Sequence, residues 1–415
     1  MKKFLAFTMA AAMTLSLAAC GGGSGSGSNT SADGSGSAAF KLGAQTPDAA
    51  NTSAVQENTG SAFKLGGTGP LTGDASIYGL AAQRGAQIAV DEINAEGGAI
   101  QFELKYEDDV NDPEKAVNAY NALKEWGMQI SLGSVTTQPC IATSSYNFAD
   151  SIFALTPSAS SPDVISGKDN VYQMCFSDPN QGTASAKYIS EQKLGEKVFI
   201  IWKSDDNYST GIKDKFVAEA ETLGLNVVGN ATFTADSKND FTVQLTQAKQ
   251  AGADLLFLPI YYDAASLILT QANAMGYAPK FFGVDGMDGI LTQANFDTSL
   301  AEGVMLLTPF NADDEDEATQ HFVKAYQEKY NETPIQFAAD AYDCVYAYKQ
   351  ALETAGCTPD MSAADINAKL KETFPTITFT GLTGDGAGIT WDSTGAVSKS
   401  PKGMVIKDGA YVGMD

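Results

Sequence analysis

Hydroxyl and tyrosine side chains gather directly after several short apolar segments that have the composition of buried strands. They are Ser134, Thr136 and Thr137 after one segment, Ser158, Ser160 and Ser161 after the next, and Tyr208, Tyr261 and Tyr262 after two more. Asp285 follows a fifth apolar segment. Hydroxyls can bind a carboxylate, with about 1.5–3 kcal/mol for each hydrogen bond to an ionised group, and a buried carboxylate pairs with an ammonium group. Since tyrosine rings add apolar walls, the set suits a zwitterionic ligand.

The same residue types also have a purely structural explanation. Serine and threonine after a strand commonly cap the next helix, and each of these residues taken singly is better explained as a cap or a turn. Their concentration at successive strand ends favours a binding site, because parallel α/β sheets bind ligands at the carboxyl ends of their strands. From the residues alone, both explanations stay open.

Groups for catalysis or metal binding are missing from the sequence. The single histidine, His321, lies on a charged segment where we expect a solvated helix residue. One histidine cannot supply a histidine metal cluster, and neither G-x-S-x-G nor G-x-x-x-x-G-K-[ST] occurs. The neighbouring carboxylates of Asp108–Asp109 and Asp205–Asp206 follow strands and should point to opposite faces. We therefore predict no catalytic residue, no metal and no cofactor.

Strand and helix patterns alternate from Phe63 to the C-terminus, which predicts an α/β fold with helices on both faces of parallel sheets. The expected strands are 102–106, 129–135, 152–156, 198–203, 255–261 and 304–308, with short strands at 388–391 and 403–412. The expected helices are one that ends at Gly97, then 113–126, 182–192, 210–223, 241–250 and 264–275. The folded part exceeds what one hydrophobic core usually serves, so two domains are expected.

The N-terminus has the pattern of a secretory signal. Two lysines precede an apolar run from residue 4 to about residue 17, which is too short to span a bilayer. The sequence LAAC at 17–20 resembles the bacterial lipoprotein processing box, which implies cleavage before Cys20 and a diacylglyceryl group on its thiol. We therefore expect residues 1–20 to be a lipoprotein signal peptide, with Cys20 as a lipid anchor on the outer face of the plasma membrane or in the periplasm. The alternative is an ordinary signal peptide with an incidental cysteine.

Residues 21–61 are predicted to be a disordered tether. They are rich in Gly, Ser, Ala, Asn and Thr and cannot bury enough apolar surface to fold. Within them, AFKLG at 39–43 recurs at 62–66, where the second copy begins the first expected strand. We interpret the first copy as a local duplication without function.

Charge and cysteine content add two limits. The net charge is −24, from 26 Lys and Arg against 50 Asp and Glu, which argues against nucleic acid and anionic lipid as partners. Besides Cys20 the chain has Cys140, Cys175, Cys344 and Cys357 without a C-x-x-C pair, and the sequence does not assign disulfides among them.

Six stretches together resemble a known family. They are GGTGPLTGDASIYG at 66–79, AQIAVDEINAEGG at 86–98, YEDDVNDPEKAV at 106–117, SLGSVTTQP at 131–139, LTPSASSPD at 155–163 and DPNQGTASAKYI at 178–189. Their order and spacing resemble the type I periplasmic solute-binding proteins of the leucine/isoleucine/valine-binding group, the substrate-binding proteins of branched-chain amino acid ABC transporters. The resemblance runs from about Phe63 to the C-terminus.

This resemblance implies two Rossmann-like lobes joined by a three-strand hinge, with the ligand between them. The first lobe would comprise residues 62–177 and 309–379, and the second would comprise 178–308 and 380–415. Hinge closure would bury an amino acid and present the closed surface to the permease of an ABC importer. We expect a monomer with a small-molecule ligand.

The resemblance also implies roles for nine residues. They are the carboxylate contacts Ser134 and Ser160, the ammonium contacts Asp285 and the carbonyl of Ser158, the second-lobe residues Tyr208, Tyr261 and Gly286, and the side-chain pocket residues Tyr78 and Phe337. Asp285 stands where the family has glutamate, and Gly133 where it often has a disulfide-forming cysteine. The shorter Asp285 leaves the particular amino acid open.

Other functions remain as alternatives. A binding protein on the same fold could serve a receptor rather than a permease, or could bind an amide, a polyamine or a sugar. A surface hydrolase would need a nucleophile and a base in the cleft, where His321 is badly placed. A structural surface protein would show no saturable binding of a small molecule.

Overall fold

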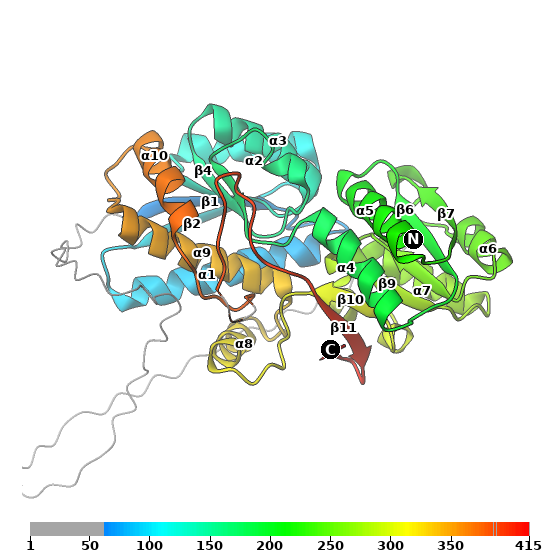
Figure 1. Ribbon diagram of the computed structural model, residues 1–415. Coiled ribbons are helices and arrows are strands. Elements are labelled where there is room, and N and C mark those ends of the chain that lie inside the picture. Colours follow the sequence, from blue (N-terminus) through cyan, green and yellow to red (C-terminus); the bar gives the residue numbers. More distant parts are fainter. Residues whose placement is uncertain (1–61, 385, 387, 415) are drawn as a thin grey trace, which may run out of the picture. The chain divides into compact units, whose positions relative to one another are not determined.

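The computed structural model describes residues 62–384, 386 and 388–414, and their strands form two sheets (Figure 1). The predicted signal peptide, Cys20, the tether and the first AFKLG copy lie outside the described residues and stay predictions. Among the residues described, no helix combines the length and apolar character needed to cross a membrane.

The first sheet is wholly parallel, with the strand order β2-β1-β3-β4-β5. Its strands are β1 (Phe63–Gly69), β2 (Phe102–Asp108), β3 (Ile130–Ser134), β4 (Phe153–Thr156) and β5 (Val171–Gln173). Its helices are α1 (Ser76–Glu96), α2 (Pro113–Trp126), α3 (Thr137–Ala149), α8 (Glu317–Tyr330), α9 (Gln336–Ala355) and α10 (Ala363–Thr373). Figure 1 shows α2 and α3 on one side of this sheet and α1 and α9 on the other. We call this part the first lobe.

The second sheet has the order β12-β11-β10-β9-β8-β6-β7 and is mixed, because β11 pairs antiparallel with both β10 and β12. Its strands are β6 (Val198–Lys203), β7 (Val227–Phe233), β8 (Leu255–Leu258), β9 (Lys280–Gly283), β10 (Met305–Thr308), β11 (Lys402–Lys407) and β12 (Ala410–Gly413). Its helices are α4 (Asp178–Glu191), α5 (Asn207–Leu223), α6 (Thr242–Gln250) and α7 (Tyr262–Ala274). We call this part the second lobe. The predicted α/β class with two parallel-sheet lobes is confirmed, with an antiparallel edge at the C-terminus.

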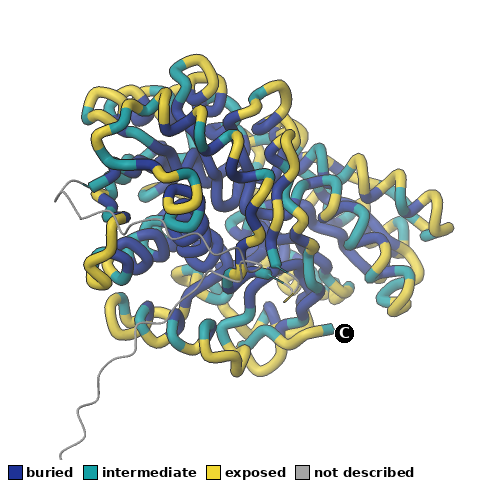
Figure 2. The backbone as a smooth tube through the Cα atoms, turned by 60° about the vertical axis from the view of Figure 1, so that its left-hand side comes forward, coloured by how far each residue is buried: buried dark blue, intermediate teal, exposed yellow. Residues whose placement is uncertain are grey.

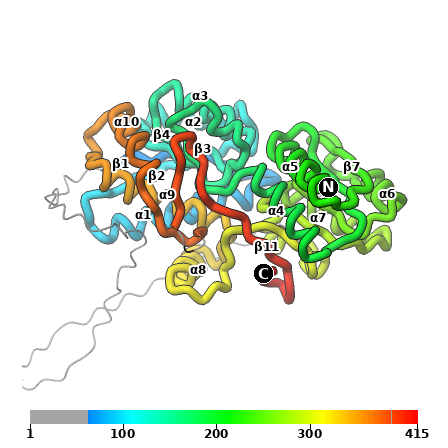
Figure 3. The backbone as a smooth tube through the Cα atoms, viewed as in Figure 1, coloured from blue at the N-terminus to red at the C-terminus, as the bar shows by residue number. Residues whose placement is uncertain are grey.

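The chain passes between the lobes three times. It enters the second lobe between β5 and α4, returns between β10 and α8, and crosses again just before β11 (Figure 3). The predicted boundary at residue 380 is wrong, because Leu382, Thr383, Trp391 and Lys399 all bond to the first lobe. There the Trp391 indole donates to the Gln173 carbonyl at 2.7 Å, and Lys399 pairs with Asp340 at 2.7 Å. The third crossing therefore lies near residue 400.

The helix boundaries follow local capping chemistry. The prediction of α2 is confirmed at both ends, since Asp112 accepts the Lys115 N–H at 2.9 Å and Gly127 ends the helix in the left-handed conformation at φ 93°. Helices α4, α5 and α7 begin two to four residues before their predicted starts. Their first residues lack a helical apolar period, so the sequence pattern placed the starts too late.

Apolar side chains fill the space between each sheet and the helices that cover it. Figure 2 shows buried residues in the interior and exposed residues on the outer turns of the chain. The four cysteines in the described part are buried and free. His321 on α8 lies 3.0 Å from the Glu92 carboxylate, so it is a partnered helix residue and not a freely solvated one.

Candidate ligand-binding site

Aromatic residues from both lobes form one cluster where the lobes meet. Tyr78 on α1 stacks on Phe337 at 4.2 Å between ring centroids and meets Tyr261 edge-on at 5.3 Å. Tyr261 in turn packs against Tyr208 on α5 at 4.9 Å. These four predicted pocket residues therefore do come together in the structure. Their rings make an apolar wall with polar tips, which suits a small ligand with an apolar side chain.

Asp285 lies beside this wall and is 3% exposed. Its Oδ1 accepts the Tyr208 hydroxyl at 2.5 Å, and the same hydroxyl accepts the Gly286 N–H at 2.9 Å. Burial raises the pKa of Asp285 to about 7, although the Tyr208 hydroxyl and the nearby Gln181 side chain act in the opposite direction. No ion pair among the described residues includes Asp285. The site thus holds a desolvated carboxylate that lacks a cation.

Backbone contacts fix the loop that carries Asp285. The loop follows β9 at the carboxyl edge of the second sheet. The Asp285 N–H donates to Gln181 Oε1 at 3.1 Å, and its carbonyl accepts Gln336 Nε2 at 2.8 Å. Asp288 accepts the Gln336 N–H at 2.9 Å and the Tyr411 hydroxyl at 2.7 Å. Both lobes and the C-terminal strand therefore hold the position of Asp285.

The hydroxyls of the three predicted serine contacts differ in whether they hydrogen-bond to other groups of the protein. Ser134 Oγ bonds to Thr68 Oγ1 at 2.5 Å and Thr143 Oγ1 at 3.0 Å, and Ser158 Oγ donates to the Val135 carbonyl at 2.6 Å. Both hydroxyls are thus used by the protein. Ser160 Oγ is buried and has no hydrogen-bond partner among the described residues.

Unpartnered polar atoms mark the rest of the site. Besides Ser160 Oγ they include the hydroxyls of Thr136 and Thr137, the Gln181 amide nitrogen and both carboxylate oxygens of Asp178. Folded proteins pair most buried polar atoms, so a group of unpaired ones at one place indicates room for a polar ligand. Asp178 and Gln181 were not among the site residues predicted from the sequence. Their signal is the sequence DPNQG at the start of α4, which belongs to one of the stretches that carry the family resemblance.

Several polar contacts join the lobes around the aromatic cluster. The Tyr78 hydroxyl donates to the Gly286 carbonyl, and the Tyr262 hydroxyl donates to the Asp74 carbonyl at 2.6 Å. Lys238 of the second lobe pairs with the Asp74 carboxylate of the first. These contacts lie between residues far apart in the sequence and hold the two lobes against each other.

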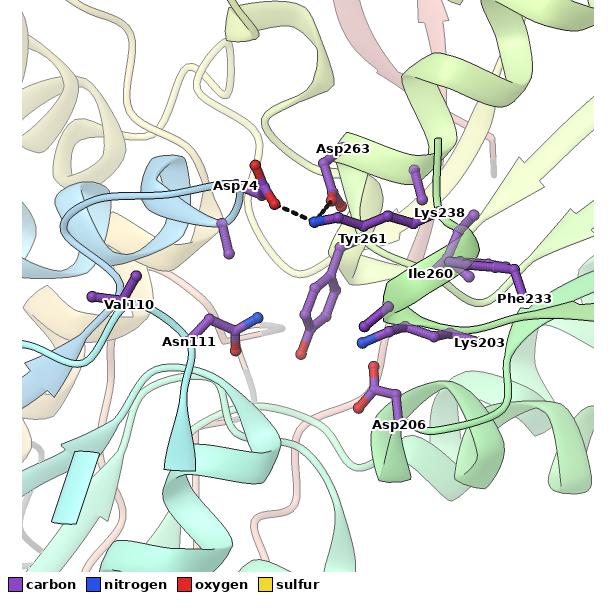
Figure 4. A pocket seen from close by; sticks show the side chains of 13 residues that line it. Asp74, Val110, Asn111, Lys203, Asp206, Phe233, Lys238, Ile260, Tyr261 and Asp263 are labelled. Carbon is purple, nitrogen blue, oxygen red and sulfur yellow. Dashed lines mark hydrogen bonds and ion pairs between the residues drawn. The ribbon is translucent and has the colours of Figure 1, made fainter. Parts of the chain in front are cut away.

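A cavity of about 230 Å³ lies next to this cluster. Figure 4 shows Tyr261 extending into it between Asn111 of the first lobe and Lys203 of the second, with Asp206 nearby. Tyr261 is the one predicted site residue in its lining; the others lie deeper. Burial raises the pKa of Asp206 to about 6. The cavity is therefore a polar space that borders the aromatic wall. In the described part of the chain, no group of three or more His, Cys, Asp or Glu side chains could hold a metal ion.

The absence of a side chain at Gly286 is a requirement of this packing. A Cβ there would lie 2.6 Å from the Tyr208 hydroxyl and 2.9 Å from the Tyr261 ring. We expect Gly286→Ala to displace Tyr208, break its bond to Asp285 and weaken ligand binding by about tenfold, since tight contacts cost about 1–3 kcal/mol. Isothermal titration calorimetry would measure the loss.

Gly98→Ala is the control, because a Cβ there meets nothing within 4 Å. It should keep the ligand affinity near that of the wild type. Equal affinities for the two variants would contradict a role for close packing at Gly286.

The chain is similar to known binding proteins over most of its length. The model of the family described as periplasmic binding protein matches residues 62–399. The Leu/Ile/Val-binding protein homolog 3 of Brucella melitensis is 28% identical over 356 residues, which cover 85% of this chain and 93% of the relative. The leucine-, isoleucine-, valine-, threonine- and alanine-binding protein of Pseudomonas aeruginosa is 28% identical, covering 75% of this chain and 83% of the relative.

Solved structures show the same similarity. The branched-chain amino acid transporter substrate binding protein LivJ of Streptococcus pneumoniae, solved with isoleucine, matches with a TM-score of 0.76 and 28% identity over 84% of this chain and 97% of that one. The leucine binding protein LivK of Thermotoga maritima matches with a TM-score of 0.75 and 25% identity over 85% of this chain and 98% of that one. With a family match over more than half of its residues, this chain belongs to the periplasmic binding protein family of extracytoplasmic solute-binding proteins.

Proposed function

We propose that the protein is the substrate-binding component of an ABC importer and binds an amino acid with an apolar side chain between its lobes. The observation that carries this proposal is the buried carboxylate of Asp285, which lies beside an aromatic wall and to which the described residues supply no basic partner. A ligand ammonium group would supply the missing cation. The ligand side chain would then lie against the rings of Tyr78, Tyr261 and Phe337.

The names of the relatives support the ligand class. Proteins of Brucella, Pseudomonas and Streptococcus that resemble this chain are named for branched-chain amino acids, and the streptococcal structure contains isoleucine. A more distant fold neighbour from Rhodopseudomonas palustris, at 18% identity, was solved with benzoate. We therefore propose leucine, isoleucine or valine as the first ligands to test, ahead of aromatic acids.

The unpartnered hydroxyls support a place for the ligand carboxylate. Ser160, Thr136 and Thr137 have buried hydroxyl oxygens without a hydrogen-bond partner in the described structure. Ser134 and Ser158 would hold the two first-lobe loops in place and offer their backbone groups. The ligand would lie with its carboxylate at these loops and its ammonium group at Asp285, and the lobes would close over it.

The cellular role follows from the same proposal. We propose export by the N-terminal signal, a lipid anchor on Cys20, delivery of the ligand to a membrane permease, and no catalytic activity. The protein would act as a monomer that presents its ligand-bound surface to the permease.

A thermal-shift screen of the purified protein tests this function. Amino acids, amines, amides, sugars and carboxylates would each be added at high concentration. A ligand at about one hundred times its dissociation constant adds about 2.7 kcal/mol of stability, which raises the Tm by a few degrees. Shifts by leucine, isoleucine or valine would support the proposal. Shifts by sugars or aromatic acids alone would refute the amino acid assignment.

A further inference from the structure

Asp178 is a buried carboxylate beside the proposed site that nothing in the described part of the chain neutralises. It begins α4, is 0% exposed, and neither of its carboxylate oxygens has a hydrogen-bond partner among the described residues. Burial raises the pKa of Asp178 well above its usual value, the neighbouring Ser160 hydroxyl lowers it, and the charges that act on it, those of Asp285, Asp206 and Asp163, all raise it. A buried carboxylate without a partner costs several kcal/mol unless it takes up a proton or meets a cation.

The fold places Asp178 among the ligand residues. Its backbone N–H donates to the Ser160 carbonyl at 3.0 Å, so the two residues are adjacent. Asp178 and Gln181 are three residues apart on α4 and share one helix face. Gln181 in turn accepts the backbone N–H of Asp285 at 3.1 Å. Asp178 thus lies between the first-lobe serine loop and the Asp285 loop.

The side chain of Asp178 faces the helix that carries Tyr208. Its Oδ2 lies 3.4 Å from the position that a Cβ of Gly211 would take on α5. Tyr208 is in the first turn of the same helix and bonds to Asp285. Asp178, from α4, and Asp285, from the loop after β9, therefore both approach the N-terminal part of α5.

Three neighbouring side chains here carry buried polar atoms without a hydrogen-bond partner among the described residues. Ser160 Oγ, Gln181 Nε2 and the two Asp178 oxygens are all buried and unpaired among the described residues. One hydroxyl, one amide N–H₂ and one carboxylate supply both donors and acceptors. A zwitterion is a ligand that can satisfy both kinds, whereas a simple carboxylate would leave the Asp178 oxygens unpaired.

We infer that Asp178 is a second acidic residue of the ligand site and that Asp178 and Asp285 together select a primary ammonium group. The inference rests on the proposed function, because it takes the ligand to lie between the Ser160 and Asp285 loops. An ammonium group has three N–H donors, and the Asp285 oxygen Oδ1 already accepts the Tyr208 hydroxyl. A second carboxylate gives another N–H an ionised acceptor. N-methylation replaces one of the three N–H donors with a methyl group, and loss of the amine removes all three.

Calorimetric titration of the wild-type protein and of Asp178→Asn with four probes tests this inference. The probes are L-leucine, N-methyl-L-leucine, isoamylamine and isocaproate. Because a hydrogen bond to a charged group contributes about 1.5–3 kcal/mol, Asp178→Asn should lower the affinity for L-leucine and for isoamylamine by about tenfold or more. The preference for L-leucine over its N-methyl derivative should shrink, and the affinity for isocaproate should change by less than about threefold.

Asp343→Asn is the matched control. Asp343 is a buried acid whose carboxylate accepts the Leu382 and Thr383 N–H groups within the first lobe, so its variant should retain near wild-type affinity for all four probes. Thermal melts would show that each variant is folded.

The outcomes separate the inference from the proposed function. If the wild type binds L-leucine and Asp178→Asn binds it equally well, the inference is wrong and the proposed function stands. Equal losses for all four probes would also overturn the inference, because they would show a structural role. If isoamylamine binds in an Asp178-dependent way and L-leucine does not bind, the inference stands and the amino acid assignment fails. A wild type that binds no ammonium compound of the set overturns the inference.

Discussion

Asp285→Ala should lower the affinity for the amino acid ligand by about 2 kcal/mol or more, which is about thirtyfold in the dissociation constant. The wild-type carboxylate is 3% exposed, and the bound ammonium group would be equally desolvated. Removal of the carboxylate leaves the ligand cation buried without an ionised partner. Calorimetric titration at neutral pH would measure the change in affinity and would compare the binding enthalpies of the variant and the wild type.

Asp343→Asn provides a matched control for this variant. Asp343 is also buried and has a pKa raised by burial to about 6, but its carboxylate accepts the Leu382 and Thr383 N–H groups within the first lobe. Its replacement should change stability and leave the ligand affinity within about threefold. An Asp285→Ala protein with wild-type affinity would remove Asp285 from the site.

Replacement of Asp285 by asparagine should lower ligand affinity but raise the folding stability of the ligand-free protein. Burial raises the pKa of the folded Asp285 from 3.8 to about 7, so its ionised form is destabilising. The stability linked to its protonated form is present below the unfolded pKa and is lost as the pH rises through about 7. Asparagine cannot ionise and should therefore make the ligand-free protein more stable near pH 8 and change little near pH 4. The same carboxylate thus favours binding and disfavours the empty fold.

Much of this arrangement could be predicted because its signals are local. The proline at the start of α2 and the glycine after its end fix that helix from single residues. Each buried strand is a short apolar run, and the residues after it meet at one edge of a parallel sheet. This geometry is why Tyr208, Tyr261 and Asp285 could be placed together although they lie far apart in the chain.

The parts that escaped prediction depend on distant contacts. The Ser134 hydroxyl forms a hydrogen bond with the Thr68 hydroxyl, and a strand pattern in the sequence does not reveal this pairing. Asp178 precedes the apolar period of α4, so it had the features of an ordinary acidic residue in the first turn of a helix. The sequence from 380 to 399 lacks a strong strand or helix pattern, and it does not reveal the bonds that join Trp391 to Gln173 and Lys399 to Asp340. Such pairings become visible only in the folded chain.

The acidity of the site should make ligand affinity rise with pH from about 5 to about 7. Asp285 titrates near pH 7 in the ligand-free protein, and below that pH it carries a proton that the ammonium group must displace. Two titratable groups act on the pKa of Asp285, Tyr208 on α5 and Asp340 on α9. The charge of Asp285 in turn raises the pKa of Asp178 on α4. The bond from Tyr208 lowers the pKa of Asp285, whereas the negative charge of Asp340 raises it. Neither group is a cation, so we expect the ligand ammonium group to supply the positive charge that stabilises ionised Asp285.

For the release of one proton, affinity should increase by up to about tenfold for each pH unit below 7 and then level off, because the ammonium group of a free amino acid stays protonated well above neutral pH. Titrations in two buffers of different ionisation enthalpy would count the protons released at each pH. In Asp285→Asn the rise should be largely lost, since the amide has no proton to release. A wild-type affinity that is constant from about pH 5 to about pH 8 would mean that Asp285 is ionised before the ligand arrives, and that a cation within the protein already compensates its burial.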